Sequence, residues 1–280
     1  MTPERIELKG DAGTIVADRW EATGGRGTVL LLHGGGQTRH SWARSGPRFA
    51  DAGWTTISLD ARGHGDSDWA PDGDYSMDGL VRDLTAVVAQ IGESPVLIGA
   101  SMGGITSLVA EGDRPGLARA LVLVDVAPRV EPAGTQRILD FMAAAPDGFA
   151  SLEEVAAAIA AYNPHRKRPS SLEGLKKNVR QGDDGRWRWH WDPAFLQVRD
   201  EPSRHTDYDR LRAAAERVAI PTMLVRGTSS DVVSPEGAAE LQQLIPHAVV
   251  REAKAGHMVA GDDNDVFATQ VVEFLDAQLD

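Results

Sequence analysis

The chain contains no cysteine among its 280 residues. This absence excludes disulfide bonds, metal sites with thiolate ligands and any mechanism that uses a cysteine nucleophile. It also leaves the redox compartment undetermined by the sequence.

Long apolar runs are absent as well. No run approaches the roughly 18 residues that a membrane-spanning helix needs, and the first residues, MTPERIELKGDAG, lack the apolar centre of a secretory signal. We therefore expect a soluble, cytoplasmic protein.

Positive charge is in the minority. Lys and Arg number 29 against 41 Asp and Glu, which gives a net charge of -12. A surface of this sign repels nucleic acids and anionic membranes. The expected partner is a small molecule, neutral or cationic, and neither nucleic acid nor membrane.

Recognisable metal and cofactor motifs are lacking too. The chain has no HExxH sequence, its histidines are scattered, and it has neither a P-loop nor a dinucleotide-binding GxGxxG followed by an acidic residue. The acidic stretch GDDND lacks the central glycine and final glutamate of an EF-hand, and Asn264 or Asp265 is better explained as a helix cap. We expect no cofactor and no metal.

What is present is an alternation of short β-branched or leucine-rich runs with amphipathic segments. This order is typical of an α/β protein with a mostly parallel sheet and helices on both faces. Eight strands are predicted, at residues 4–8, 14–20, 28–32, 55–59, 95–98, 119–124, 222–225 and 248–251. Helices are predicted at residues 41–52, 76–90, 102–111, 235–244 and 265–279.

The alternation is interrupted between residues 128 and 217, where the segments look helical and none resembles a buried strand. We predict a helical lid inserted into a core formed by residues 1–127 and 218–280. Within it, Trp187, Trp189 and Trp191 alternate with Arg188 and His190. If this segment is extended, the three indoles share one face, where they line an acyl pocket or seat the lid on the core.

A candidate nucleophile follows the strand predicted at residues 95–98. Ser101 lies in GASMG, a G-x-S-x-G pattern placed between a buried strand and an apolar helix. This context is typical of the nucleophile elbow of α/β-hydrolases. The turn is so tight that only small residues fit beside the serine, and the helix N-terminus behind it favours developing negative charge.

A serine hydroxyl needs a base to take its proton and an acid to orient that base. His257 lies in AGHMV, after the last strand and before the last helix. Asp231 follows the strand TMLVRG, and Asp125 follows the strand ALVLV. All three loops are expected at the carboxyl edge of the sheet. Asp231 fits the chain order Ser, Asp, His of this fold and is the predicted acid, with Asp125 the alternative.

Acyl transfer also needs N–H donors for the oxyanion. The backbone of Met102, directly after the serine, is one candidate. The other comes from the loop HGGG at residues 33–36, with Gly35 the expected donor and Gly36 a possible substrate contact. His33 and His64 are predicted to be structural.

The stretches LLHGGG, DARGHGDSD, GASMGG, VRGTSSDVV and AGHMV occur in the order and spacing of the α/β-hydrolase family. The chain resembles cofactor-independent bacterial esterases, lactonases and perhydrolases that carry HG, a small residue and a later Trp, as in HGGGQTRHSW. This resemblance implies the triad Ser101, Asp231 and His257. Epoxide hydrolases and haloalkane dehalogenases of the same fold carry Asp at the elbow, so Ser101 argues against both.

The function implied is hydrolysis of a small carboxylester or lactone through an acyl-enzyme on Ser101. Three alternatives use the same residues or the same fold. They are a cofactor-free perhydrolase or haloperoxidase, a carbon–carbon bond hydrolase, and a ligand-binding protein without catalysis.

Overall fold

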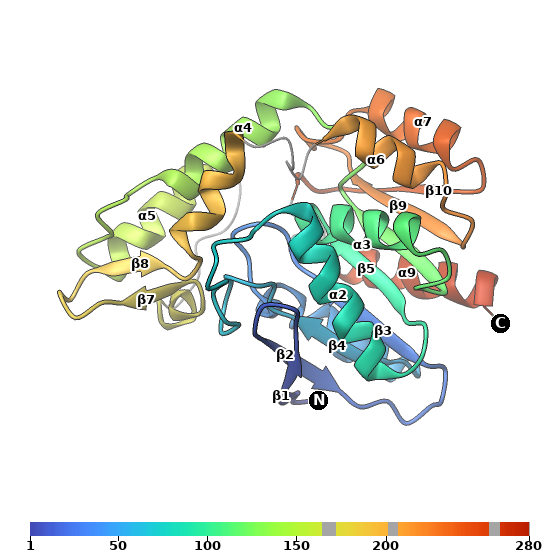
Figure 1. Cartoon of the computed structure of the whole chain (residues 1–280), viewed down its shortest axis with the longest axis horizontal. Coiled ribbons are helices and arrows are strands. Elements are labelled where there is room, and N and C mark those ends of the chain that lie inside the picture. The colour runs from blue at the N-terminus through green and yellow to red at the C-terminus, as the bar shows by residue number, and fades with distance from the viewer. Residues whose placement is uncertain (164–171, 201–206, 258–263, 280) are drawn as a thin grey trace.

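The computed structural model describes residues 1–163, 172–200, 207–257 and 264–279. The strands of its main sheet are β1 (Glu4–Lys9), β2 (Thr14–Trp20), β3 (Thr28–Leu32), β4 (Thr55–Leu59), β5 (Val96–Ala100), β6 (Ala120–Val124), β9 (Thr222–Gly227) and β10 (Val249–Ala253). They form one sheet in the order β1-β2-β4-β3-β5-β6-β9-β10. β2 is antiparallel to both neighbours, and the other pairs are parallel. The predicted mostly parallel eight-stranded α/β sheet is confirmed (Figure 1).

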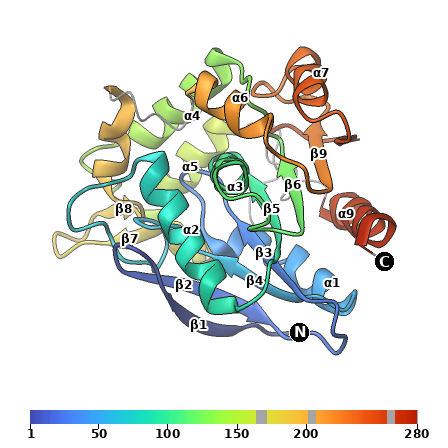
Figure 2. The same ribbon diagram turned by 45° about the vertical axis from the view of Figure 1, so that its right-hand side comes forward.

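Helices cover both faces of this sheet (Figure 2). They are α1 (Ser45–Asp51), α2 (Met77–Ile91), α3 (Met102–Asp113), α6 (Tyr208–Ala215), α7 (Pro235–Leu244) and α9 (Asn264–Leu279). α1 and α9 pack on one face, and α2, α3, α6 and α7 pack on the other. The five helices predicted for the core are therefore present, with shifts of a few residues at their ends.

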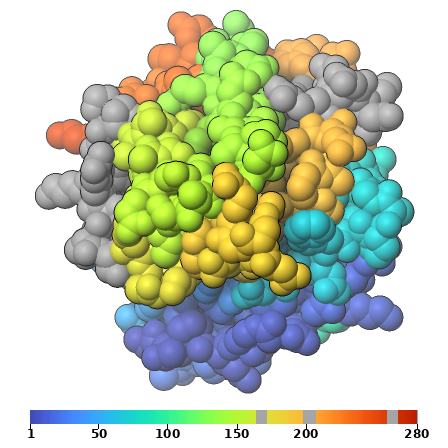
Figure 3. All heavy atoms as spheres, turned by 90° about the vertical axis from the view of Figure 1, so that its left-hand side faces the viewer, coloured from blue at the N-terminus to red at the C-terminus, as the bar shows by residue number. Residues whose placement is uncertain are grey.

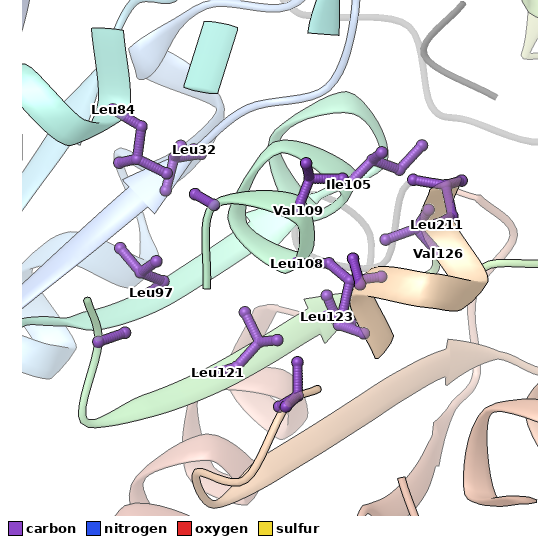
Figure 4. Packing of buried hydrophobic residues seen from close by; sticks show 14 of the residues in the cluster. Leu32, Leu84, Leu97, Ile105, Leu108, Val109, Leu121, Leu123, Val126 and Leu211 are labelled. Carbon is purple, nitrogen blue, oxygen red and sulfur yellow. The ribbon is translucent and has the colours of Figure 1, made fainter. Parts of the chain in front are cut away.

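The two faces have separate apolar cores because successive strand residues point in opposite directions. Leu97 and Leu121 belong to the cluster on the α3 side of the sheet, together with Ile105 and Leu108 of that helix (Figure 4). The next residues along the two strands, including Ile98, join the cluster under α1 and α9. Burial on both faces explains why these strands read as continuous apolar runs.

Local signals set the ends of α2 and α7. Ser76 precedes α2 and its hydroxyl accepts the Gly79 N–H at 3.2 Å, while Gly92 ends the helix in the left-handed conformation at φ 79°. Ser234 caps α7 in the same way, and Pro235 occupies its first turn. Both starts use a hydroxyl acceptor for an otherwise unpaired backbone donor.

The segment between β6 and β9 contributes no strand to the main sheet. Its elements are α4 (Pro132–Ala143), α5 (Leu152–Tyr162), the short helix η2 (Glu173–Lys177), the hairpin strands β7 (Val179–Gln181) and β8 (Trp187–Trp189), and the short helix η3 (Pro193–Asp200). Figure 1 shows these elements gathered beside one end of the sheet, and Figure 3 shows them covering that side of the molecule. We call this segment, residues 128–207, the cap.

Two expectations about the cap are corrected. The stretch from Leu175 to Phe195 was predicted to be helical, but it contains the β7–β8 hairpin, because its alternating residues pair across a turn at Gly185 with φ 76°. The predicted lid also extended to residue 217. However, α6 packs on α3, and its Leu211 belongs to the main core (Figure 4).

Among the described residues, no helix combines the length and apolar character that crossing a membrane would require.

Candidate active site

Ser101 lies at the turn between β5 and α3 with a backbone conformation that side chains rarely adopt. Its φ is 46° and its ψ is -116°. A β-carbon on Gly99 would lie 2.4 Å from the backbone of Gly103, and one on Gly103 would lie 2.5 Å from the carbonyl oxygen of Leu32. The small residues around the serine are therefore required by close contact between β3, β5 and α3, as the elbow pattern predicts.

Asp125 directly follows β6, at φ 49°, and its side chain is fully buried. Three donors point at its carboxylate. The Gly227 N–H reaches Oδ1 at 2.8 Å, and the Ser230 hydroxyl reaches Oδ2 at 2.5 Å. His257 Nδ1 lies 2.7 Å from Oδ2. Because a carboxylate only accepts, this contact leaves the proton on Nδ1 and a lone pair on Nε2 of His257.

The strand ends bring this pair to the candidate nucleophile. Ala100, the last residue of β5, is the register partner of Val124, the last residue of β6. The N–H of Ser101 donates to the Val124 carbonyl at 3.2 Å. Ser101 and Asp125 therefore follow neighbouring strands at the same edge, with His257 hydrogen-bonded to the second of them.

Asp231 does not make the contact predicted for it. Its carboxylate pairs with Arg137 of α4 at 2.7 Å, and both side chains are partly exposed. The loop after β9 is turned by Ser230, whose hydroxyl oxygen accepts the N–H groups of Val232 and Val233 at 3.1 Å each. The acid that orients His257 is therefore corrected from Asp231 to Asp125.

The loop after β3, residues 33–36, lies directly against the serine. A β-carbon on Gly34 would be 3.3 Å from the Ser101 β-carbon. The Gly34 N–H is taken by Gln37 Oε1 at 3.1 Å. Across the residues that the structure describes, no acceptor is assigned to the N–H of Gly35 or of Met102. These two donors, both predicted for an oxyanion, are available at the point where the strand order reverses between β4 and β5.

Gly36, predicted as a substrate contact, has its N–H engaged elsewhere. It donates to His64 Nε2 at 3.1 Å, while His64 Nδ1 lies 3.0 Å from the Arg62 carbonyl. His33 is held similarly, with Nδ1 2.8 Å from the Gly34 carbonyl and Nε2 3.0 Å from the Ala61 N–H. Burial lowers the pKa of His33, so its ring is neutral and binds loop backbone.

Apolar side chains from the cap close over this loop. A β-carbon on Gly35 would lie 3.7 Å from Phe195 Cζ and 3.8 Å from Met142 Sδ. Both belong to a buried cluster, here called the site cluster, that also contains Met102 and Trp191. The surroundings of the two free N–H groups are therefore apolar, which strengthens electrostatic interactions with an oxyanion.

The predicted contacts of Trp187 and Trp189 lie mainly within the cap. Trp187 pairs with Phe149 through both backbone groups, at 2.7 and 2.8 Å. Trp189 stacks on Trp191 with ring centroids 5.0 Å apart and meets Phe149 edge-on at 5.1 Å. Trp187 and Trp189 therefore pack mainly within the cap itself, and neither the acyl-pocket hypothesis nor the seating hypothesis is confirmed for them. Trp191 is the one that joins the site cluster as a fully packed member.

Within the described ranges, no group of three or more His, Asp or Glu side chains is arranged so that it could hold a metal ion. The acidic stretch after His257 lies outside those ranges, as do the predicted capping side chains of Asn264 and Asp265.

The match to known families covers most of the chain. Residues 27–263 match the model of the alpha/beta hydrolase fold family. The chain belongs to this family. The hydrolase is 33% identical over 267 residues to esterase Rv0045c of Mycobacterium tuberculosis, covering 92% of this chain and 84% of that protein.

Comparison with solved structures supports the same family. A structure of the same mycobacterial esterase superposes on the hydrolase with a TM-score of 0.78 at 30% identity, over 99% and 93% of the two chains. An E-2-(acetamidomethylene)succinate hydrolase gives a TM-score of 0.83 at 23% identity, over 98% and 99%. At 23% identity, the likeness to the second structure shows a shared fold and nothing further.

Proposed function

We propose that the hydrolase cleaves small carboxylesters or lactones through an acyl-enzyme on Ser101, with His257 as base and Asp125 as the acid that orients it. The observation that carries this proposal is the hydrogen bond between His257 Nδ1 and the buried Asp125 carboxylate, at the end of the strand next to the elbow. An imidazole held in this tautomer presents Nε2 as a base.

In the first half of the reaction, the Ser101 oxygen attacks the substrate carbonyl while its proton passes to His257 Nε2. Asp125 stabilises the imidazolium that forms. The N–H groups of Gly35 and Met102 hold the oxyanion, and the tetrahedral intermediate collapses as His257 returns the proton to the leaving alcohol.

In the second half, water takes the place of the alcohol. His257 removes its proton as it attacks the acyl-enzyme carbonyl, the same two N–H groups hold the second oxyanion, and the acid product leaves as Ser101 regains its proton. A lactone follows the same steps, except that its alcohol remains part of the product.

The class of substrate is supported by two observations. The mycobacterial relative at 33% identity is an esterase. In addition, Met142 and Phe195 lie within van der Waals distance of a β-carbon placed on Gly35, so the space beside the oxyanion donors is narrow and apolar. The first observation favours an ester, and the second favours an uncharged substrate with a small acyl group.

The first test replaces the nucleophile. Ser101→Ala is expected to lower kcat for p-nitrophenyl acetate by at least about 10³-fold, because the covalent route is lost while the oxyanion donors remain. Steady-state hydrolysis is measured together with circular dichroism, which should be unchanged.

A fluorophosphonate probe provides the second readout. Wild type should be labelled at Ser101, as located by peptide mass spectrometry, and Ser101→Ala should not. Activity of the variant within a few-fold of wild type would reject the nucleophile. Failure of the wild type to hydrolyse or to be labelled would instead support a ligand-binding protein without catalysis.

A further inference from the structure

His190 is a buried cap residue that the proposed reaction does not use. It follows β8, between Trp189 and Trp191, and is 2% exposed. Its Nδ1 accepts the N–H of Gly65, in the loop after β4, at 2.7 Å. Since Nδ1 accepts, the ring proton is on Nε2, which is buried and has no hydrogen bond of good geometry within the described part of the chain.

The backbone of Gly36 is the polar group that interacts with the His190 ring from the oxyanion side. The N–H of the same glycine is held by His64, and the rings of His64 and His190 lie 5.8 Å apart. Gly36 has φ 72°, a conformation that glycine adopts without strain, so the hydrogen bond from its N–H to His64 is the contact that fixes its orientation. The residue that precedes it, Gly35, carries one of the two free donors.

The hydrogen bond from the Gly65 N–H requires a neutral His190 ring, because Nδ1 must carry a lone pair. Asp66, Arg180, His33 and His64 are the titratable or charged side chains around it. Burial lowers the pKa of His190 to about 3, helped by the nearby positive charge of Arg180. At neutral pH the lone pair on Nδ1 is therefore always present for the Gly65 N–H.

We propose that His190 is a positioning residue. It ties the cap hairpin to Gly65, and the adjacent His64 holds the Gly36 N–H, so that the Gly35 N–H faces the substrate only while the hairpin is seated. This inference rests on the proposed function, because it concerns the same oxyanion donors. In this proposal the cap both covers the substrate and holds an oxyanion donor in its working orientation.

The matched pair His190→Asn and His190→Gln tests the acceptor. The Asn Oδ1 occupies nearly the place of the imidazole Nδ1, whereas the Gln amide occupies that of Nε2, so only Asn can accept from Gly65. We expect Asn to keep kcat for p-nitrophenyl acetate within about threefold of wild type. Gln should lower kcat by about tenfold or more, with KM within twofold, because loss of an oxyanion donor acts on the transition state.

Arg188→Ala is the control on the same hairpin. Arg188 is exposed, and among the described residues its ion pair is with Asp184 inside the hairpin turn. The kcat and KM of this variant should therefore match wild type. Equal kcat in the Asn and Gln variants, with both folded by circular dichroism, would overturn the proposal. So would a loss in Gln that appears only in KM.

If His190→Gln does not fold, a second variant tests the same proposal. Arg180 fixes the same hairpin from an exposed position, through Gly65 O at 2.9 Å and Asp66 Oδ1 at 2.6 Å. Arg180→Ala should lower kcat at least about threefold with KM unchanged, and an unchanged kcat would overturn the proposal. If wild type hydrolyses esters and only these variants disagree, the proposed function stands and the role of His190 fails.

Discussion

At the scale of single residues, the decisive contact is between Asp125 and His257. The carboxylate receives three hydrogen bonds and is fully buried, so it cannot rotate away. Asp125→Asn would keep the shape but present an amide, which favours the wrong imidazole tautomer. We expect kcat for a short activated ester to fall by about 10³- to 10⁴-fold.

The matched control is Asp231→Asn. Asp231 pairs with Arg137 at a partly exposed position, and such pairs contribute at most about 1 kcal/mol. Its kcat should stay within about threefold of wild type. If steady-state kinetics gave the opposite ranking of the two variants, the assignment of the acid would return to Asp231.

The sequence allowed the positions of Ser101 and His257 to be anticipated, but not the choice between the two aspartates. The elbow pattern requires a strand before it and a helix after it, and both are present. Asp125 and Asp231 each follow a parallel strand, and each lies between the serine and the histidine in chain order. The choice depends on the turn made by Ser230 and on the left-handed backbone at Asp125, which arise only in three dimensions.

At the scale of elements, the sheet was predictable and the cap was less so. Strands such as β6 are buried on both faces, and their continuous apolar runs predict them from sequence. The β7–β8 hairpin has three residues in each strand, and its stability comes from packing of Trp187 and Trp189 against Phe149. Such short strands give only a brief alternation, here that of Trp187, Trp189 and Trp191, and the wider segment around it is therefore predicted to be helical from sequence.

Helix α2 is fixed to the loop after β4 by a buried ion pair. Arg62 is 2% exposed, and its guanidinium binds Asp83 through two N–H groups, at 2.5 and 2.8 Å. The Asp83 carboxylate also accepts the Asp11 N–H at 2.7 Å. A cavity of about 40 Å³ adjoins both side chains of the pair.

Asp83→Ala is expected to lower the free energy of unfolding by about 3–5 kcal/mol. It removes the carboxylate that binds the buried Arg62 through two hydrogen bonds, leaves only the longer ion pairs with Asp11 and Asp74 at 3.8 and 3.9 Å, and enlarges a cavity. Arg82, the preceding residue of α2, is about half exposed and pairs with Asp11 and Asp74. Arg82→Ala should cost less than about 1 kcal/mol. Urea unfolding measures both values. Equal losses would mean that burial of the Arg62 pair does not matter for stability.

At the scale of the whole molecule, neutral buried histidines and ionised carboxylates both connect stability to pH. The pKa of His33 and of His190 is lowered by burial. Asp18 and Asp66 have their pKa lowered by hydrogen bonds and charge from neighbouring cations, which outweigh burial. The two sets titrate in different ranges, so acid should weaken the fold in two stages.

The first stage belongs to the histidines. A ring with a folded pKa of about 3, as for His190, binds fewer protons than the unfolded chain, whose histidines titrate near 6.5. Stability is therefore complete above pH 6.5 and is lost as the pH falls from there toward 3, by about 2 kcal/mol between pH 7 and pH 5 for this one ring. The carboxylates lower the free energy of unfolding further only below about pH 4.

Urea unfolding at pH 7, 6 and 5 measures the first stage. His190→Asn, which has no titrating ring, should show a smaller fall in the free energy of unfolding than wild type. Parallel curves for the two proteins would mean that His190 is not held neutral by the fold.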